Sequence, residues 1–343
     1  MQVSIFRNYG GPEVLTLAEA PAPEVEPGHV LIKILAAGIN RLDHYLRAGA
    51  YSQGLPLPLV LGSDASGEVA AIGAGVTGFR IGERVIPMPG YPLAGEDYDF
   101  EPISAAPSYA VAGVRQWGTY AQYVQTPARW VVKDPTGLPP HQIATLPMVV
   151  VTAVRALRSV GEVKAGDRVL ILGGASGTGS MAVQVARALG AKVAATVNSP
   201  HKAEFVRSLG ADLVIDASKD DFVAKTAEWT KGRGLDAVLD NLGGDYIQRS
   251  LAAVRPQGVV VSIGFVAGVN VSFNIVDFFF SQKQLRGSLM GTKQDLEWGL
   301  EQVRAGAIRP LVDRVLPLRA AAEAHRLLAC SQVQGNLVLD PWA

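Results

Sequence analysis

The sequence predicts an α/β protein that joins a β-rich domain to a second domain built on a doubly wound parallel sheet. Its 343 residues suggest about two domains, because single domains commonly contain roughly 150 residues. The first third contains short β-prone runs between glycine and proline turn signals. From about Ala128, apolar strands alternate with helical patterns. We therefore assign residues 1–124 and 293–343 to the β-rich domain and residues 125–292 to the parallel-sheet domain.

The composition excludes several classes of protein. Apolar residues make up 48% of the chain and charged residues 18%, which rules out a disordered tail, a coiled coil or a fibrous protein. Lysine plus arginine number 31, as do aspartate plus glutamate. This balance supplies no excess of positive charge for nucleic acid or for an anionic membrane surface.

Cysteine usage and the apolar segments favour a cytoplasmic protein. Cys330 is the single cysteine, so neither an intrachain disulfide nor a zinc site with two thiolates can form. The first residues show no basic segment followed by an apolar core, and we expect no signal peptide. Residues 256–276 are long enough to span a membrane, but polar residues and glycines interrupt them and their pattern is strand-like.

The expected elements of the first domain are short strands. These are residues 30–35, 67–72 and 120–124, whose spacing suggests a small barrel or sandwich. Residues 87–118 are rich in proline, glycine and tyrosine and have neither helical nor strand periodicity. We interpret them as a lobe inserted into this domain.

The remaining chain follows the order expected of a doubly wound sheet. Predicted strands are residues 168–172, 192–197, 213–216, 236–240 and 259–263. Predicted helices between the first three are residues 179–189 and 201–209, the second ended by a glycine C-cap at Gly210. Helices at 296–305 and 318–328 and a strand at 337–339 then return to the first domain.

A glycine-rich loop follows the first strand of the parallel sheet and precedes a helix. This context is the one required of a dinucleotide-binding fingerprint. A glycine-rich backbone can approach a pyrophosphate closely, and the positive end of the helix dipole attracts its charge. The loop consists of Gly173, Gly174, Ala175, Ser176, Gly177, Thr178 and Gly179.

The end of the second strand favours NADPH over NADH. NAD-preferring sheets carry an acid there that accepts from the ribose 2′-hydroxyl, but this chain has no acid between Gly190 and Glu204. Asn198 and Ser199 end the strand, and Lys202 adds a positive charge suited to a phosphate monoester. Ser199 before a proline is also a good helix N-cap, and the two interpretations are compatible.

Several ordered motifs resemble the medium-chain dehydrogenase/reductase superfamily over nearly the whole chain. Beside the glycine loop they are residues 10–15, 37–43, 47–49, 61–67, 309–315 and 321–326. The resemblance is closest to the zinc-free quinone oxidoreductase and zeta-crystallin branch. It implies a GroES-like catalytic domain, a Rossmann domain and an active-site cleft between them.

The resemblance also implies that no metal is used. Zinc-dependent relatives hold their catalytic zinc with two cysteines and a histidine, where this chain carries Asn40, Ser63 and Met148. An amide, a hydroxyl and a thioether are poor ligands for a Lewis-acid zinc. The lobe at 87–118 matches a structural zinc lobe but contains no cysteine.

Without a metal, the remaining chemistry is hydride transfer from a reduced nicotinamide to an acceptor that is already electrophilic. Quinones and α,β-unsaturated carbonyls qualify, because one hydrogen-bond donor can stabilise the oxygen on which charge develops. Tyr45 and Tyr51 resemble the family's active-site tyrosines, and Asn40 and Asp43 would shape the same wall. Tyrosines of this kind can instead serve only as packing residues.

Further cofactor residues follow from the resemblance. Thr152 resembles the threonine beside the nicotinamide, and Asn241 lies near the adenosine half. Gly264 and Phe265 would approach the nicotinamide amide, and Asn336 occupies a position where NADPH-using relatives often carry a lysine.

The sequence leaves alternatives open. The enzyme could be an enoyl-thioester or alkenal reductase of the same superfamily, or a nucleotide-binding, crystallin-like protein with little catalysis. Residues 259–273 and the aromatic run 278–280 suit the interface of a homodimer, although they suit core packing equally well.

Overall fold

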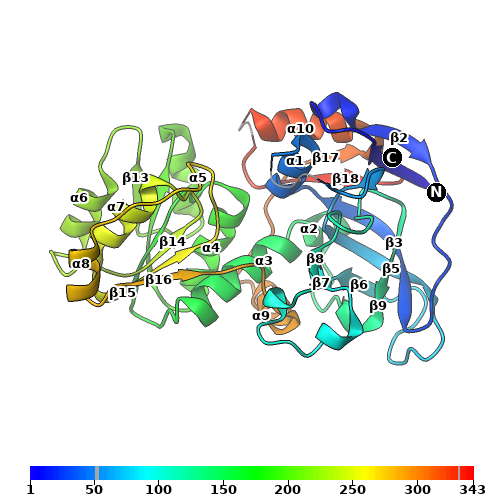
Figure 1. Cartoon of the computed structure of the whole chain (residues 1–343), viewed down its shortest axis with the longest axis horizontal. Coiled ribbons are helices and arrows are strands. Elements are labelled where there is room, and N and C mark those ends of the chain that lie inside the picture. The colour runs from blue at the N-terminus through cyan, green and yellow to red at the C-terminus, as the bar shows by residue number, and fades with distance from the viewer. Residues whose placement is uncertain (51–53, 331–332) are drawn as a thin grey trace. The chain divides into compact units, whose positions relative to one another are not determined.

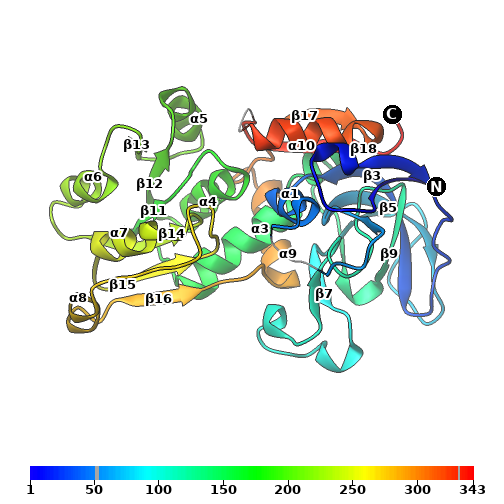
Figure 2. The ribbon, with the colours of Figure 1, turned by 45° about the horizontal axis from the view of Figure 1, so that its top comes forward.

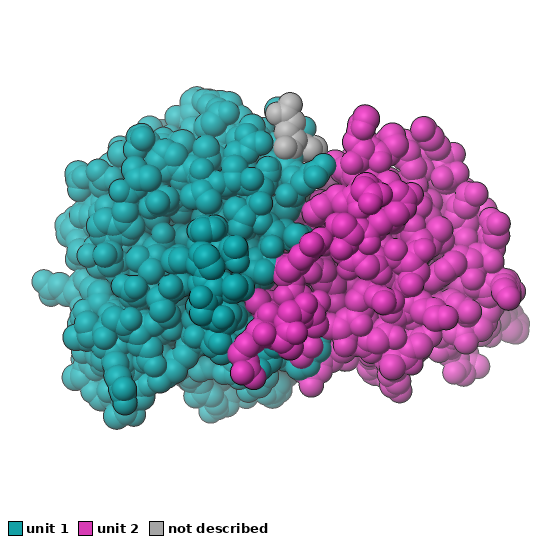
Figure 3. All heavy atoms as spheres, turned by 180° about the vertical axis from the view of Figure 1, so that it is seen from behind, with its two compact units in different colours: residues 1–148, 292–301, 310–343 teal, residues 149–291, 302–309 magenta. Residues whose placement is uncertain are grey.

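The computed structural model describes residues 1–50, 54–330 and 333–343. The chain forms two compact units, coloured separately in Figure 3. Unit 1 comprises residues 1–148, 292–301 and 310–343, and unit 2 comprises residues 149–291 and 302–309.

Unit 1 is the β-rich unit, and its largest sheet has seven strands in the order β10-β6-β5-β3-β18-β17, with β9 also paired to β3. β3 is antiparallel to β5, β9 and β18, so it is the central strand of this sheet. The other sheets are β2-β1-β4 and the hairpin β7-β8. The strands of unit 1 are β1 (Gln2–Phe6), β2 (Thr16–Glu19), β3 (His29–Gly38), β4 (Leu59–Val60), β5 (Asp64–Ile72), β6 (Arg84–Pro87), β7 (Gly90–Pro92), β8 (Tyr109–Val111), β9 (Tyr123–Pro127), β10 (Val131–Lys133), β17 (Val312–Pro317) and β18 (Asn336–Asp340).

Helices close the apolar interior of unit 1. Alternate residues of β3, including Val30, Ile32 and Ile34, are fully buried, as period-two patterning requires. Helix α1 packs against α10, and α10 also contacts β17 and β18 (Figure 2). The helices of this unit are α1 (Arg41–Ala48), α2 (Pro140–Ile143) and α10 (Ala321–Ala329), with short 3-10 turns η1 (Pro12–Val14), η2 (Gly95–Asp97), η3 (Ile103–Ala105), η4 (Ala128–Trp130) and η7 (Leu318–Ala320).

Unit 2 is a parallel six-stranded sheet in the order β13-β12-β11-β14-β15-β16 (Figure 1). The chain starts at β11, runs outward to β13, then returns to β14 on the other side of β11. Helix α4 packs on β11 and β12, whereas α7 packs on β14 and β15. This order confirms the predicted doubly wound sheet, with its switch point between β11 and β14.

The strands of unit 2 are β11 (Arg168–Ile171), β12 (Lys192–Val197), β13 (Leu213–Asp216), β14 (Leu235–Asp240), β15 (Val254–Ser262) and β16 (Gln284–Gly287). Its helices are α4 (Gly177–Ala188), α5 (Ala203–Ser208), α6 (Phe222–Trp229), α7 (Asp245–Ala253) and α8 (Ile275–Phe280), with the π-helical turn η5 (Arg155–Val160) and the 3-10 turn η6 (Pro200–Lys202). Helices α3 (Pro147–Val154) and α9 (Lys293–Arg304) lie at the unit boundaries.

The structure differs from the sequence analysis in where the first unit ends. We predict a change of domain after residue 124, whereas the compact unit continues to Met148. The reason is strand pairing, because β9 pairs with β3 and β10 pairs with β6. Several other strands are not predicted from the sequence, among them β16 and β17, which lie at sheet edges and carry little apolar alternation.

The helical run Pro140–Val160 is long and apolar enough to cross a membrane by composition alone. Its most apolar window is 72% buried inside the protein, as is typical of a core helix of a folded protein.

One close backbone approach holds helix α4 against the loop after β11. A Cβ built on Gly179 would lie 2.1 Å from the carbonyl oxygen of Gly173. We therefore expect Gly179→Ala to destabilise unit 2 by about 1 to 3 kcal/mol through overpacking. Thermal unfolding followed by circular dichroism would measure this loss.

The matched control for this substitution is Gly287→Ala, because a Cβ at Gly287 would meet nothing within 4 Å. Equal unfolding temperatures for the two variants would contradict the steric argument.

Candidate functional site

The predicted cofactor residues of unit 2 gather at one edge of its sheet. The glycine loop follows β11, Asn198 and Ser199 follow β12, Asn241 follows β14, and Gly264 follows β15. These four strands are neighbours and parallel, so their carboxyl ends share the same edge. Tertiary structure thus brings together residues that are up to about 90 positions apart in the sequence.

The glycine loop presents the start of helix α4. Ser176 is the N-cap, and its Oγ accepts from the Gly179 amide at 3.0 Å. Gly173 adopts a left-handed φ of 63° that favours glycine at the turn. At a helix start the amides of Gly177 and Thr178 have no intrahelical acceptor, so they are free to bind an anion.

Asn241 contacts the glycine loop and carries an unused polar atom. Its Nδ2 donates to Ser176 Oγ at 3.4 Å, whereas its buried Oδ1 has no hydrogen-bond partner within the described chain. Gly264 is close by, since a Cβ there would lie 2.3 Å from the Asn241 carbonyl oxygen. An orphaned acceptor beside a glycine cradle fits a bound nucleotide that brings its own donors.

The end of β12 carries the hydrogen-bond donors predicted to bind a 2′-phosphate, but the Asp216 carboxylate lies on the neighbouring strand. Ser199 begins the turn η6, which ends at Lys202. In the parallel register Val197 lies opposite Asp216 on β13. A hydrogen bond from Ser218 lowers the pKa of Asp216, so this side chain is anionic at neutral pH. Asp216 is not among the predicted cofactor residues, because it lies on the next strand, outside the segment between Gly190 and Glu204.

Thr152 belongs to a helix and Asn336 to a strand of unit 1, whereas Phe265 directly follows Gly264 at this edge. Thr152 lies in α3, where its hydroxyl faces the sulfur of Met290 at 4.0 Å. Asn336 begins β18 in unit 1, is buried, and donates to the Thr145 carbonyl at 3.4 Å. Phe265 is partly exposed after β15. Tyr51 lies outside the residues that the structure describes.

Unit 1 contains a buried polar cluster around Asp64. Asn40 Nδ2 donates to Asp64 Oδ2 at 2.9 Å and to Ser63 Oγ at 3.3 Å. The Met148 amide donates to Asp64 Oδ1 at 2.8 Å. Of the three positions where the resemblance places zinc ligands, Asn40 and Met148 therefore bind the Asp64 carboxylate, and Ser63 joins through Asn40. Burial raises the pKa of Asp64 to about 7.

Asp43 lies beneath this cluster and does not form an open wall. Its side chain is 1% exposed, and it accepts hydrogen bonds from the amides of Asn40 and Gly62 and from the Tyr120 hydroxyl. Burial raises the pKa of Asp43 to about 6, although these hydrogen bonds act in the opposite direction. Tyr45, two residues after Asp43 in α1, is half-buried and packs edge-on against His44.

The side chains at the positions equivalent to zinc ligands do not fit a zinc ion. Asn40 turns its amide nitrogen, a donor, toward Ser63 and Asp64, and Met148 takes part through its backbone amide. In the described ranges, no group of three or more histidine, cysteine, aspartate and glutamate side chains could hold a metal.

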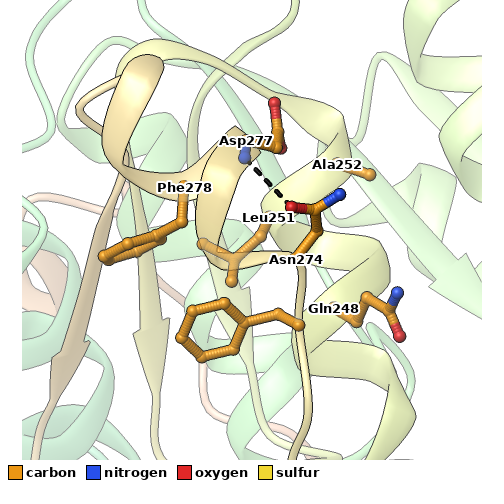
Figure 4. A pocket seen from close by; sticks show the side chains of 7 residues that line it. Gln248, Leu251, Ala252, Asn274, Asp277 and Phe278 are labelled. Carbon is orange, nitrogen blue, oxygen red and sulfur yellow. Dashed lines mark hydrogen bonds between the residues drawn. The ribbon is translucent and has the colours of Figure 1, made fainter.

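A separate hollow of about 200 Å³ lies on unit 2, away from the glycine loop (Figure 4). Phe273, Phe278 and Leu251 form its apolar floor, and Asn274 caps helix α8 beside it by accepting from the amides of Val276 and Asp277. This hollow contains none of the predicted site residues.

Two sequence families match the chain. Residues 26–140 match the alcohol dehydrogenase GroES-like domain, and residues 177–305 match the zinc-binding dehydrogenase family. These matches confirm the predicted combination of a GroES-like domain and a Rossmann-type sheet.

Several oxidoreductases are similar to the chain over nearly its whole length. A 2-haloacrylate reductase from Burkholderia sp. is 32% identical, with all of both chains aligned. A quinone oxidoreductase from Pseudomonas aeruginosa is 31% identical over 98% of each chain. The crystal structure of an NAD-dependent alcohol dehydrogenase is 35% identical and matches with a TM-score of 0.92 over 99% of each chain. The fold, the two family matches and these relatives together show that the chain is an NAD(P)-dependent oxidoreductase that belongs to the medium-chain dehydrogenase/reductase superfamily.

Proposed function

We propose that this enzyme reduces a quinone or an α,β-unsaturated carbonyl with NADPH and without zinc. The observation that carries the proposal is the Asn40–Ser63–Asp64 cluster, where hydrogen-bonding side chains replace metal ligands. An acceptor that is already electrophilic needs no Lewis acid, and the names of the two reductase relatives fit such acceptors.

Unit 2 holds the cofactor in this proposal. The free amides of Gly177 and Thr178 bind the pyrophosphate, and Asn241 accepts from the nucleotide through its orphaned Oδ1. Gly264, Phe265 and Thr152 line the nicotinamide side. When bound, the reduced cofactor supplies the hydride, and the protein supplies orientation and exclusion of water.

Unit 1 stabilises the acceptor. The developing negative charge on the carbonyl oxygen needs a hydrogen-bond donor, and Tyr45 and Tyr51 are our candidates. Asn40 shapes the wall beside them, held by Asp64. Asp43 is assigned here to support this wall from beneath, because its buried oxygens are occupied.

The choice of NADPH rests on Ser199, His201 and Lys202 at the end of β12. The Asp216 carboxylate one strand away opposes a 2′-phosphate and favours NADH. Three potential donors, one of them a lysine, outweigh one acid that is already hydrogen-bonded to Ser218.

The homodimer is a further part of the proposal. β16 is an edge strand of the unit 2 sheet, and apolar side chains near it are exposed. They include Val269, Ile275, Phe279 and Phe280, with Phe280 74% exposed. Exposure on this scale disfavours the core interpretation for Phe279 and Phe280 and fits contact with a second copy, whereas Phe278 packs against the core of unit 2. We place the enzyme in the cytoplasm, where the free, exposed Cys330 would stay reduced.

An enoyl-thioester or alkenal reductase remains the second candidate, because 2-haloacrylate, the substrate in the name of one relative, is an activated alkene. Turnover of NADPH with enones but not with quinones would favour it. Nucleotide binding without turnover of either acceptor would favour a crystallin-like role.

Lys202→Ala should weaken NADPH binding by about 1 to 3 kcal/mol, because a charge-assisted hydrogen bond to the 2′-phosphate is lost. Titration calorimetry with NADPH and NADH, followed by turnover of quinones and enones in the presence of a zinc chelator, tests the whole proposal. Lys192→Ala, at the opposite end of β12, is the matched control. Equal affinity for NADH would overturn the NADPH assignment, and loss of turnover with the chelator would overturn zinc independence.

Tyr45→Phe or Tyr51→Phe should lower kcat/KM for the acceptor more than about tenfold, because the variant removes a donor used in the transition state. NADPH affinity should stay unchanged. Tyr123→Phe, in β9, provides a control for removal of a tyrosine hydroxyl elsewhere in unit 1. A loss of tenfold or less in both site variants would remove these tyrosines from the mechanism.

Light scattering at micromolar concentration should give about twice the chain mass of 36.2 kDa. Phe280→Glu should shift the protein toward monomer, because a charge would be buried at the interface. Ile81→Glu, at an equally exposed apolar position in unit 1, should leave the mass unchanged. A monomeric wild type would reject the dimer.

A further inference from the structure

A chain of buried hydrogen bonds runs through unit 1 behind Asn40. Tyr120 Oη donates to Asp43 Oδ2 at 2.9 Å and lies 3.3 Å from His325 Nε2. His325 Nδ1 accepts from Arg47 Nε at 3.3 Å. All four side chains are at most 2% exposed. The chain links helix α1, the segment before β9 and helix α10, whose residues are far apart in sequence.

The hydrogen bonds of this network all run in the same direction, with each donor on the side of Arg47 and each acceptor on the side of Asp43. Arg47 can only donate, so its bond to His325 requires an unprotonated Nδ1. A neutral imidazole then carries its proton on Nε2 and donates to Tyr120, which donates in turn to Asp43. Burial, followed by the charge of Arg47, holds the pKa of His325 at about 3, so the ring is neutral at any working pH. Arg47 also donates to the Gly10 carbonyl and contacts His44.

Asp43 connects this hydrogen-bond network to two backbone segments. Its Oδ2 accepts from the Asn40 amide at 2.8 Å and its Oδ1 accepts from the Gly62 amide at 3.2 Å. Asn40 and Ser63, the residue after Gly62, are the two side chains that meet above it at 3.3 Å. The carboxylate therefore sets the spacing of the two strand ends that carry the proposed acceptor wall.

We propose that Tyr120 and His325 are positioning residues of the reaction: they orient the Asp43 carboxylate, which holds Asn40 and Ser63 in place. This inference rests on the proposed function, because it needs Asn40 beside the acceptor. The two residues act through Asp43 and touch neither substrate nor cofactor.

A merely structural network would affect stability alone, whereas a positioning network affects the chemical step. Transition-state stabilisation is sensitive to small displacements of the groups that line the site. The cofactor residues of unit 2 are not part of the network, so cofactor affinity should not change with it. A fall in kcat at constant NADPH affinity therefore separates the two roles.

Tyr120→Phe is the first variant, because it removes only the central hydroxyl. We expect kcat to fall about tenfold or more, as for loss of a hydrogen bond to a charged group, with the Kd for NADPH unchanged. Tyr91→Phe is the matched control: Tyr91 is also buried, and its hydroxyl accepts from Gln116 in the lobe. Its kcat should stay within about twofold of wild type. Equal kcat values for the two variants would overturn the proposal.

A second pair of variants tests His325. His325→Gln can accept from Arg47 and donate to Tyr120, whereas His325→Leu can do neither. The kcat of His325→Gln should stay within about threefold of wild type, whereas that of His325→Leu should fall further. Equal losses in both folded variants would contradict the relay. If leucine does not fold, the glutamine variant and Tyr120→Phe still decide the matter.

Nitrogen-15 NMR of histidine-labelled enzyme reads the network without turnover. The His325 resonances, assigned by their loss in His325→Gln, should show a neutral ring protonated at Nε2 from pH 5 to 8. A proton on Nδ1 would overturn the inference. If NMR shows the expected proton on Nε2 but the enzyme turns over neither quinones nor enones, the proposed function is refuted and the hydrogen-bond network is not. If the enzyme turns over quinones or enones but His325 carries its proton on Nδ1, only the inference about Tyr120 and His325 is refuted.

Discussion

Parallel pairing of β11 with both β12 and β14 is the constraint on which the nucleotide-binding unit depends. Because the chain leaves β11 in one direction and returns on its other side, the loops after neighbouring strands diverge and leave room for a ligand. The glycine loop, the end of β12 and Asn241 all reach that edge. Gly179 allows helix α4 to start close enough for its free amides to face the same space.

Unit 1 depends on a different physical effect, the cost of burying charge. Asp43, Asp64 and Arg47 are almost completely buried, and such groups persist only when hydrogen bonds satisfy them. Asp64 is satisfied by Asn40 and the Met148 amide, and Asp43 by backbone amides and Tyr120. In the proposed zinc-free site, these hydrogen bonds organise the residues at the positions where the resemblance places zinc ligands, and the network takes the role of a metal as the ordering element.

In the proposed function, the two units have different roles: unit 2 binds the cofactor and unit 1 binds the hydride acceptor. Unit 2 offers backbone amides, glycines and one orphaned acceptor, which suit an anionic dinucleotide. In the proposal, unit 1 supplies the tyrosine donors for an acceptor oxygen that becomes negative, and Asp64 holds Asn40 beside them. In the proposed cofactor site, the Asp216 carboxylate beside the end of β12 opposes the positive charge of Lys202, so more than one residue bears on cofactor preference.

Local pattern alone determined much of this protein. The strands 192–197 and 213–216 and the helix after the glycine loop follow from periodicity and caps, because these signals lie within a few residues of each other. The absence of thiolate zinc ligands follows from one cysteine. Tertiary structure decided what depends on distant partners: that β9 and β10 belong to unit 1, that Asp216 lies beside Val197, and that His325 reaches Asp43 through Tyr120. Such contacts join residues up to 205 positions apart, and no short-range pattern encodes which distant side chain will satisfy a buried charge.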